Sequence, residues 1–250
     1  MNDLLNYYET HNESERLFCD KAHQLEWLTT THFLKKYIPQ SLKVFDCCAG
    51  TGHYAFWLAE QGHTVTAADL VQKHIDIMAS SEKAKLLKDI FVCNAINMPN
   101  IKDNSYDVVL CMGAYYHTHS LIEREQIISE CIRVLKPDGI LVVAYINRTA
   151  VFLNHFKRDP YAALSDGVLD MGENGVFYAS DFNELDCLCE KFNLTPIDNI
   201  GTSGQIYMLM REINELNTKQ FNEFFNYHLK VCQEPSIIGN SMHGLYFAKK

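Results

Sequence analysis

The residues best suited to bind a ligand lie in the stretch Val44-Phe45-Asp46-Cys47-Cys48-Ala49-Gly50-Thr51-Gly52. This stretch joins a short apolar run to a helix-like segment, and its glycines let the backbone turn sharply and approach a ligand closely. Asp69 ends the next apolar run, where a carboxylate can reach a ribose diol. The pattern predicts a ribose-containing ligand at this turn. The alternative is a plain tight turn beside a surface Asp.

Two histidines and a tyrosine are candidate catalytic residues. His117 ends the stretch Gly113-Ala114-Tyr115-Tyr116-His117, and its imidazole titrates near neutral pH. It is a candidate for deprotonating or orienting a nucleophile, with a purely structural role as the alternative. His243 is a second candidate, either facing the same pocket from the opposite side or packing at a strand end. Tyr116 adjoins His117 and is the third.

Charge and hydropathy exclude several classes of function. The chain has 250 residues, with 22 Lys and Arg against 31 Asp and Glu, and its formal net charge is −9. Without clustered Lys and Arg it is unsuited to neutralising phosphates, so we predict no nucleic-acid partner. No run approaches the ~18 apolar residues of a membrane span, and residues 1–10 lack the features of a signal peptide. We therefore expect a cytoplasmic protein with no membrane association.

The cysteine pattern points the same way. The chain has nine cysteines and no Cys-x-x-Cys pair. Several lie within apolar runs, where Cys behaves as a small hydrophobic residue. An odd, scattered set indicates a reduced, cytoplasmic protein. Because the paired spacing of zinc ligands is absent, we predict no metal site.

Apolar runs and helical patterns alternate along the chain. Strands are expected at 43–47, 64–69, 91–93, 106–112, 140–146, 195–200 and 244–248, and helices at 53–61, 72–88, 121–135, 181–191 and within 212–231. Asp181 or Ser180 is the expected N-cap of the helix at 181–191. Pro137-Asp138-Gly139 predicts a turn in which Gly139 takes the positive φ. Continuous apolar strands that alternate with helices predict a parallel sheet covered on both faces.

At several of these positions the sequence resembles the class I S-adenosylmethionine-dependent methyltransferases of the bacterial small-molecule type. The resemblance covers roughly residues 40–147, and Asp138 departs from the family's usual Gly. The positions that match the family's motifs are Asp46, Gly50 and Gly52; Asp69; Asn94-Ala95; Tyr106-Asp107-Val108-Val109; and Arg133-Val134-Leu135-Lys136-Pro137-Asp138-Gly139.

The resemblance implies a doubly wound α/β fold. Its seven-stranded, mostly parallel, Rossmann-like sheet would have the strand order 3-2-1-4-5-7-6, with the last strand antiparallel. Residues 1–250 would form a single domain. Within it we expect an N-terminal helical cap (1–38), a cofactor-binding core (40–147), a lid or insertion after the fifth strand (148–180) and the C-terminal part of the sheet (181–250).

The resemblance also implies S-adenosylmethionine as cofactor and S-adenosylhomocysteine as product. Asp46 and the glycine turn would surround the methionine end, Asp69 would accept from the ribose hydroxyls, and Asn94 would meet the adenine edge. Arg16 would pair with the methionine carboxylate, and a Tyr face would lie near the sulfonium. The full set of expected cofactor-binding residues is Asp46, Cys47, Ala49, Gly50, Thr51, Gly52, Asp69, Leu70, Asn94, Ala95, Met112, Gly113, Arg16 and Tyr8.

The expected function is in-line methyl transfer to an N-, O- or S-nucleophile of a small-molecule acceptor. Three alternatives stay open at this point. One is a nicotinamide-dependent oxidoreductase, which the absence of an evident Tyr-x-x-x-Lys relay disfavours. Another is a catalytically silent module with the methyltransferase fold. The third is a soft-element substrate such as arsenite on Cys47 and Cys48, disfavoured because both lie in the cofactor turn. The acceptor and the oligomeric state cannot be read from these patterns.

Overall fold

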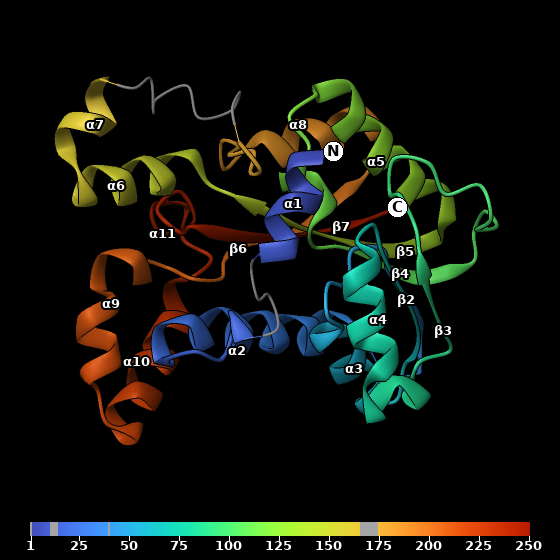
Figure 1. Ribbon diagram of the computed structural model, residues 1–250, viewed down its shortest axis with the longest axis horizontal. Helices are drawn as coiled ribbons and strands as arrows, with labels where there is room; N and C mark the ends of the chain where they lie inside the picture. Colours follow the sequence, from blue (N-terminus) through green and yellow to red (C-terminus); the bar gives the residue numbers. More distant parts are fainter. Residues whose placement is uncertain (1, 11–14, 40, 166–174) are drawn as a thin grey trace.

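The computed structural model describes residues 2–10, 15–39, 41–165 and 175–250. A seven-stranded sheet with the order β3-β2-β1-β4-β5-β7-β6 forms its centre, which confirms the predicted fold class (Figure 1). β7 pairs antiparallel with β5 and β6, and the other pairings are parallel. The strands are β1 (Lys43–Asp46), β2 (Thr64–Asp69), β3 (Asp89–Val92), β4 (Tyr106–Cys111), β5 (Leu135–Ile146), β6 (Thr195–Gly201) and β7 (His243–Lys249).

Helices cover both faces of the sheet, as Figure 1 shows. Helices α2 (Lys21–Tyr37), α3 (His53–Glu60) and α4 (Gln72–Ser80) pack on one face, and α5 (Leu121–Val134) and α8 (Glu184–Phe192) pack on the other. Helices α9 (Ile206–Glu215) and α10 (Thr218–Val231) pack against the N-terminal half of α2. The remaining elements are α1 (Asn2–Thr10), η2 (Glu82–Leu86), η3 (Ala114–His117), α6 (Arg148–Arg158), α7 (Pro160–Ser165) and α11 (Pro235–Ile238).

The strands divide their side chains between two cores. Phe45 and Val109 belong to the core under α5 and α8, whereas their neighbours Val44 and Val108 belong to the core under α2, α3 and α4. Successive side chains of a strand point to opposite faces, so a strand buried on both faces must be apolar throughout. This explains the unbroken apolar runs of the sequence.

One predicted helix is broken in two, and the helix expected within 212–231 is confirmed as α10. The segment 72–88 forms α4 and the short η2, because Ser81 adopts an extended backbone and its hydroxyl accepts from the Lys83 N–H. The segment 212–231 contains the end of α9 and all of α10. These are separated at Asn217, which forms a capping box with Gln220. Local side-chain capping therefore sets a helix boundary at both positions.

Two further local predictions were wrong. Helix α8 begins after Asn183 rather than after Ser180 or Asp181. In the Pro137-Asp138-Gly139 segment, Asp138 rather than Gly139 has the positive φ, of 63°. Gly139 is needed there for space, since an added Cβ would lie 2.7 Å from Leu135 Cδ1 and 2.9 Å from the Asp107 carbonyl oxygen.

The segment 148–180, expected as a patternless lid, contains α6 and α7, whereas residues 166–174 lie outside the described part of the chain. Among the described residues no helix is both long and apolar enough to cross a membrane.

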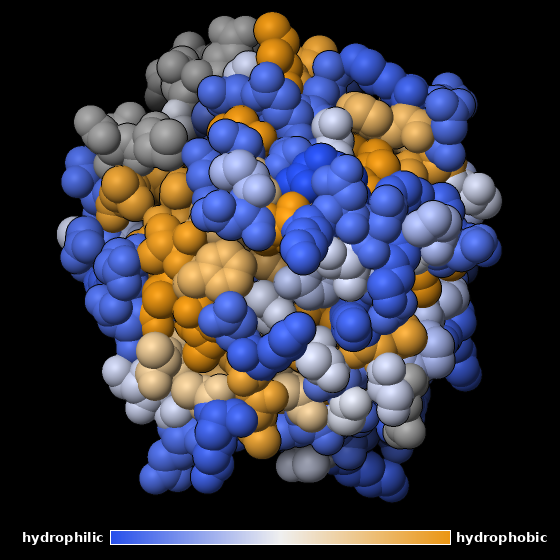
Figure 2. Space-filling model, turned by 90° about the vertical axis from the view of Figure 1, so that its right-hand side faces the viewer, coloured by the Kyte–Doolittle hydropathy of each residue, from blue (hydrophilic) through white to orange (hydrophobic). Residues whose placement is uncertain are grey.

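Figure 2 shows that the side of the molecule nearest β3 carries hydrophobic as well as hydrophilic surface. Ile77, Leu86 and Val92 are exposed large hydrophobic side chains of α4, η2 and β3.

Gly244 of β7 leaves room for the buried ring of Tyr145 on the neighbouring strand β5. It pairs with Tyr145, whose ring atoms would lie 2.2–2.4 Å from an added Cβ and whose hydroxyl donates to Asn199 Oδ1 at 2.6 Å. We expect Gly244→Ala to lower the free energy of unfolding by about 1–3 kcal/mol, because the fixed ring cannot move away. Chemical denaturation measures this loss. Gly239→Ala is the matched control, since its Cβ would meet nothing closer than 3.4 Å. Equal stability losses in the two variants would contradict the assignment.

Candidate active site

A cavity of about 490 Å³ lies at the carboxyl ends of β1, β2 and β4, which is the binding edge of an open parallel sheet. We refer to it as the central cavity. The turn after β1 forms its floor, and Tyr8 of α1 and Arg16 line it from the N-terminal segment. Its size is in the range of small-molecule and cofactor sites.

The glycine turn is held by hydrogen bonds to the neighbouring strands. The Cys47 N–H donates to the Leu110 carbonyl at 3.0 Å, and the Ala49 N–H donates to the Ala68 carbonyl at 2.9 Å. Gly50 and Gly52 have φ values of 54° and 94°, which favour glycine. Gly52 is also packed closely, because its added Cβ would lie 2.8 Å from Met78 Cγ. The turn is therefore preformed.

Asp69 connects this turn to the start of α4. Its Oδ2 accepts from the Gly50 N–H at 2.8 Å, and its Oδ1 accepts from the Val71 N–H at 2.9 Å and lies 3.1 Å from His74 Nδ1. An ionised carboxylate offers about four lone-pair sites. These contacts leave capacity for a ligand hydroxyl from the central cavity, which Asp69 lines.

Asp46 is an unusual carboxyl group at the floor of the cavity. It is only 2% exposed, and its Oδ1 has no hydrogen-bond partner among the residues that the structure describes. Burial raises the pKa of Asp46 to about 8, and nearby Asp69 acts in the same direction, whereas the Cys48 N–H opposes the shift. A buried, incompletely satisfied carboxyl group favours a ligand that brings a positive charge or a strong donor.

Aromatic residues from three separate parts of the chain lie over the cavity. His117 Nδ1 lies 2.9 Å from the Val176 carbonyl oxygen, so Nδ1 carries the proton and Nε2 accepts from the Tyr8 hydroxyl at 2.8 Å. Burial lowers the pKa of His117 to about 4, which makes it neutral at physiological pH. We call Tyr7, Tyr8, Tyr116, His117 and Phe177 the aromatic roof. Its ring centroids lie 4.9 Å apart for His117–Phe177 and 5.3 Å for Tyr7–Phe177.

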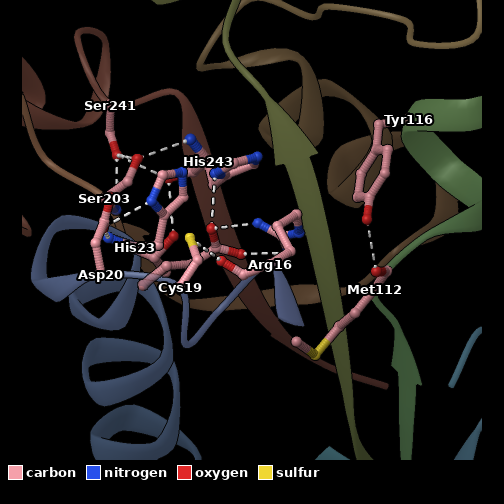
Figure 3. Close-up of polar contacts among 11 residues, drawn as sticks. Arg16, Cys19, Asp20, His23, Met112, Tyr116, Ser203, Ser241 and His243 are labelled. Carbon is pink, nitrogen blue, oxygen red and sulfur yellow. Dashed lines mark hydrogen bonds and ion pairs between the residues drawn. The ribbon is translucent and has the colours of Figure 1, made fainter. Parts of the chain in front are cut away.

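A second polar cluster lies beside the cavity. Arg16 donates two hydrogen bonds to Glu26, at 2.8 and 3.0 Å, and His243 Nδ1 lies 2.9 Å from Glu26 Oε2. Burial alone would raise the pKa of Glu26, but Arg16 and His243 hold it well below its usual range. In Figure 3 this cluster and Tyr116, which donates to the Met112 carbonyl at 3.0 Å, lie on either side of one strand.

Residues 45–143 match the methyltransferase domain family, and this segment contains the glycine turn, Asp69 and β4. Over these residues the chain carries the sequence of a methyltransferase domain. The ubiquinone biosynthesis O-methyltransferase of Rickettsia akari (strain Hartford) is 32% identical to it over 108 residues, which cover 43% of this chain and 41% of that protein. The chain thus matches less than half the length of this relative.

Two further proteins are similar to this chain, one in sequence and one in fold. The S-adenosyl-L-methionine-dependent Diels-Alderase iccD of Talaromyces variabilis is 28% identical over 115 residues, covering 44% of this chain and 38% of that protein. The crystal structure of an S-adenosylmethionine-dependent methyltransferase, possible histamine N-methyltransferase, from Thermotoga maritima has a TM-score of 0.61 and 17% identity, with 99% of each chain covered. At that identity the likeness supports the fold alone.

The methyltransferase fold brings most of the predicted residues together. Every expected cofactor-binding residue except Gly52 lines the central cavity, as do Tyr116 and His117. Gly52 lies behind the turn against Met78, and His243 lies outside the cavity beside Glu26. Arg16 lines the cavity but its guanidinium pairs with Glu26, a contact that was not foreseen. The binding roles of these residues stay predictions.

Sequence reasoning missed His74 and Glu26. His74 lies within a helical pattern, and its contact with Asp69 depends on the tight turn from β2 into α4. Glu26 lies in α2, and its partner His243 is at the far end of the chain. What distinguishes Glu26 is the burial of its carboxylate on α2, where the residue is only 8% exposed. Such burial cannot be read from one sequence.

Proposed function

We propose that this chain transfers a methyl group from S-adenosylmethionine to a small-molecule acceptor. The observation that carries the proposal is the buried carboxyl of Asp46, which lines the cavity beside the glycine turn with one oxygen unpartnered. An α-ammonium group supplies both the positive charge and the hydrogen-bond donors that this carboxyl lacks. The match to the methyltransferase domain makes S-adenosylmethionine the ligand to test first.

The lining of the central cavity fits the rest of that cofactor. The preformed turn offers backbone N–H groups near Gly50, and Asp69 has acceptor capacity for ribose hydroxyls. Leu70 and Met112 supply apolar surface for a purine ring, and Asn94 and Ala95, which also line the cavity, would lie at the edge of that ring. We assign the cofactor's methionine end to Asp46 and its adenosine end to these residues.

The bound cofactor supplies an activated methyl group, so the protein chiefly needs to position the acceptor and exclude water. Proximity and orientation account for about 7–11 kcal/mol in well-aligned reactions. The aromatic roof closes the cavity over the glycine turn, and Tyr8, Tyr116 and His117 face inward from it. Ring faces in this position also suit a positively charged sulfur, at about 0.5–2 kcal/mol.

Of the predicted histidines, His243 is the better candidate base. His117 uses both ring nitrogens within the protein and has a lowered pKa, so it fits a role in holding the roof closed. His243 has the anionic Glu26 beside Nδ1, which stabilises the imidazolium formed when Nε2 takes a proton. An acceptor held at Tyr116 in the cavity would have to extend beyond it, to the Glu26 cluster, to lose its proton to His243 Nε2 as the methyl group arrives. Tyr116 is then a positioning residue.

The acceptor class follows from this arrangement. The site offers aromatic surface in the roof and a candidate base at His243, which favours an uncharged hydroxyl or amine on a small apolar or aromatic molecule. O-methylation in ubiquinone biosynthesis, the activity in the name of the Rickettsia akari relative, is consistent with such acceptors. The formal net charge of −9 disfavours polyanions.

Calorimetric titration of the purified protein with S-adenosylmethionine, S-adenosylhomocysteine and NADH tests the proposal. We expect micromolar binding of the first two and none of NADH. Asp69→Asn should weaken binding by roughly 10–100-fold, because hydrogen bonds to a charged group contribute about 1.5–3 kcal/mol. Asp76→Asn is the matched control, since Asp76 is exposed on α4 and lies outside the cavity. Binding of NADH alone would overturn the cofactor assignment.

Methyl transfer itself needs a second readout. Incubation with a methyl-labelled cofactor and a panel of phenols and amines should yield labelled product and S-adenosylhomocysteine in equal amounts. Tight cofactor binding without transfer to any acceptor class would favour a silent module or a role like that of the Diels-Alderase relative. The two experiments therefore separate cofactor binding from catalysis.

A further inference from the structure

Four cysteine side chains from three elements meet beneath the central cavity. Cys47 and Cys48 follow β1, Cys111 ends the neighbouring β4, and Cys131 lies in α5. The Sγ atom of Cys47 is 3.5 Å from that of Cys48 and 4.0 Å from that of Cys131. The Sγ atoms of Cys47, Cys48 and Cys111 all lie within 4.8 Å of one another. The pairing of β1 with β4 thus assembles a cluster that sequence spacing does not reveal.

These separations suit three sulfur ligands around one central atom. A metal–sulfur bond of about 2.3 Å places neighbouring sulfurs about 3.8 Å apart. All these cysteines are unpaired thiols, and Cys111 is fully buried. Cys47 and Cys48 line the central cavity, which gives a small solute a path to the cluster.

Acidic groups near the cluster determine the net charge that a bound ligand can have there. The Asp46 and Glu130 carboxyl groups are its charged neighbours, coupled to Cys111 and Cys131 respectively. A group that left net negative charge among these residues would be strongly disfavoured. The ligand must replace thiol protons without adding charge.

We propose that Cys47, Cys48 and Cys111 form a binding site for a trivalent thiophilic metalloid, with arsenous acid as the simplest ligand. Three thiols and As(OH)3 give an As(S-Cys)3 complex and three water molecules. Three As–O bonds and three S–H bonds break, three As–S bonds form, and arsenic stays trivalent. The product is neutral. Zn²⁺ on the same three thiolates would leave one negative charge and release three protons. The proposal concerns binding and is independent of the methyl-transfer reaction.

Titration of the reduced protein with sodium arsenite tests the site. We expect one arsenic per chain by native mass spectrometry, with a sulfur-to-arsenic charge-transfer band in the ultraviolet. Alkylation after rapid denaturation at low pH, followed by peptide mapping, should show Cys47, Cys48 and Cys111 protected. The affinity should be nearly constant between pH 6.5 and 8, because no net proton is released. Protection at other cysteines, such as Cys187 and Cys189, would overturn the assignment.

Two variants and one competing ion sharpen the test. Cys48→Ala should weaken arsenite binding roughly tenfold or more, because it removes one of three linked ligands. Cys187→Ala, at an exposed cysteine, should leave it unchanged. Circular dichroism establishes that each variant folds, and Cys48→Ser replaces Cys48→Ala if the latter does not. Equal affinity in Cys48→Ala and the parent, or tighter binding of Zn²⁺ than of arsenite to the same thiols, would overturn the proposal.

Discussion

Replacing His243 with Ala should lower kcat for methyl transfer by about 10²–10⁴-fold, the usual contribution of a positioned general base. The imidazole lies beside the buried Glu26 carboxylate, whose charge is also neutralised by Arg16. Glu26→Gln should reproduce part of the loss, because a neutral amide stabilises the imidazolium less. Steady-state kinetics with an acceptor from the phenol and amine panel measure both effects. S-adenosylhomocysteine affinity should change little in His243→Ala.

Three controls separate a base from a structural residue. Added imidazole should partly restore the rate of His243→Ala, a result that a purely structural role would not produce. His32→Ala, at an exposed histidine of α2, should leave kcat within twofold of the parent. His117→Ala should mainly alter cofactor binding and release, since this ring holds the roof. A large loss of kcat in His117→Ala, with His243→Ala nearly normal, would reverse the two assignments.

Replacing Asp46 with Asn should weaken S-adenosylmethionine binding by roughly 10–100-fold, through loss of a charge-assisted hydrogen bond. The effect should depend on pH. The pKa of Asp46 is raised to about 8, so in the free protein this carboxyl is mostly neutral at pH 6. A cationic ligand prefers the carboxylate form. The affinity of the parent protein should therefore rise from pH 6 to 8, by up to about tenfold per pH unit, and level off above pH 8.

The Asn variant also serves as the control for this pH dependence. Any titration of the ligand's own amino group affects both proteins equally, so the difference between them isolates Asp46. The amide is close in shape to the protonated carboxyl, and the variant should fold normally. Parallel pH profiles for the two proteins would show that Asp46 does not titrate in this range or does not meet the ligand's charge.

The sequence predicts the sheet well because its determinants are local or periodic. Buried strands such as Tyr106–Cys111 are apolar throughout, and the glycines and Asp69 stand at fixed distances from the first strand. The wrong local predictions arise where one side chain or one close contact overrides the sequence pattern. Ser81 ends α4 and caps η2, Asn217 caps the start of α10, and Asp138 has the positive φ beside a closely packed Gly139. Such competition between neighbouring residues depends on three-dimensional contacts.

The parts of the candidate site that sequence reasoning missed come from long-range pairing. Glu26 meets His243 only because β7 begins beside the end of β5 and close to α2. Cys111 joins Cys47 and Cys48 only because β4 lies next to β1. A motif records residues that are close in sequence, whereas these clusters are close only in the folded chain. Their discovery therefore required the structure.

The aromatic roof has a consequence for the timing of turnover. It joins α1, anchored by Lys73 Nζ on the Tyr8 and Glu9 carbonyls at 2.9 and 2.8 Å, to residues 175–178, anchored by the Tyr178 N–H on the Tyr116 carbonyl at 2.7 Å. On the proposed function, S-adenosylhomocysteine bound beneath Tyr8 would leave only after the Tyr8–His117 hydrogen bond and the ring contacts of the roof break. We therefore expect product exchange, rather than the chemical step, to limit turnover, because each exchange would require α1 and residues 175–178 to separate.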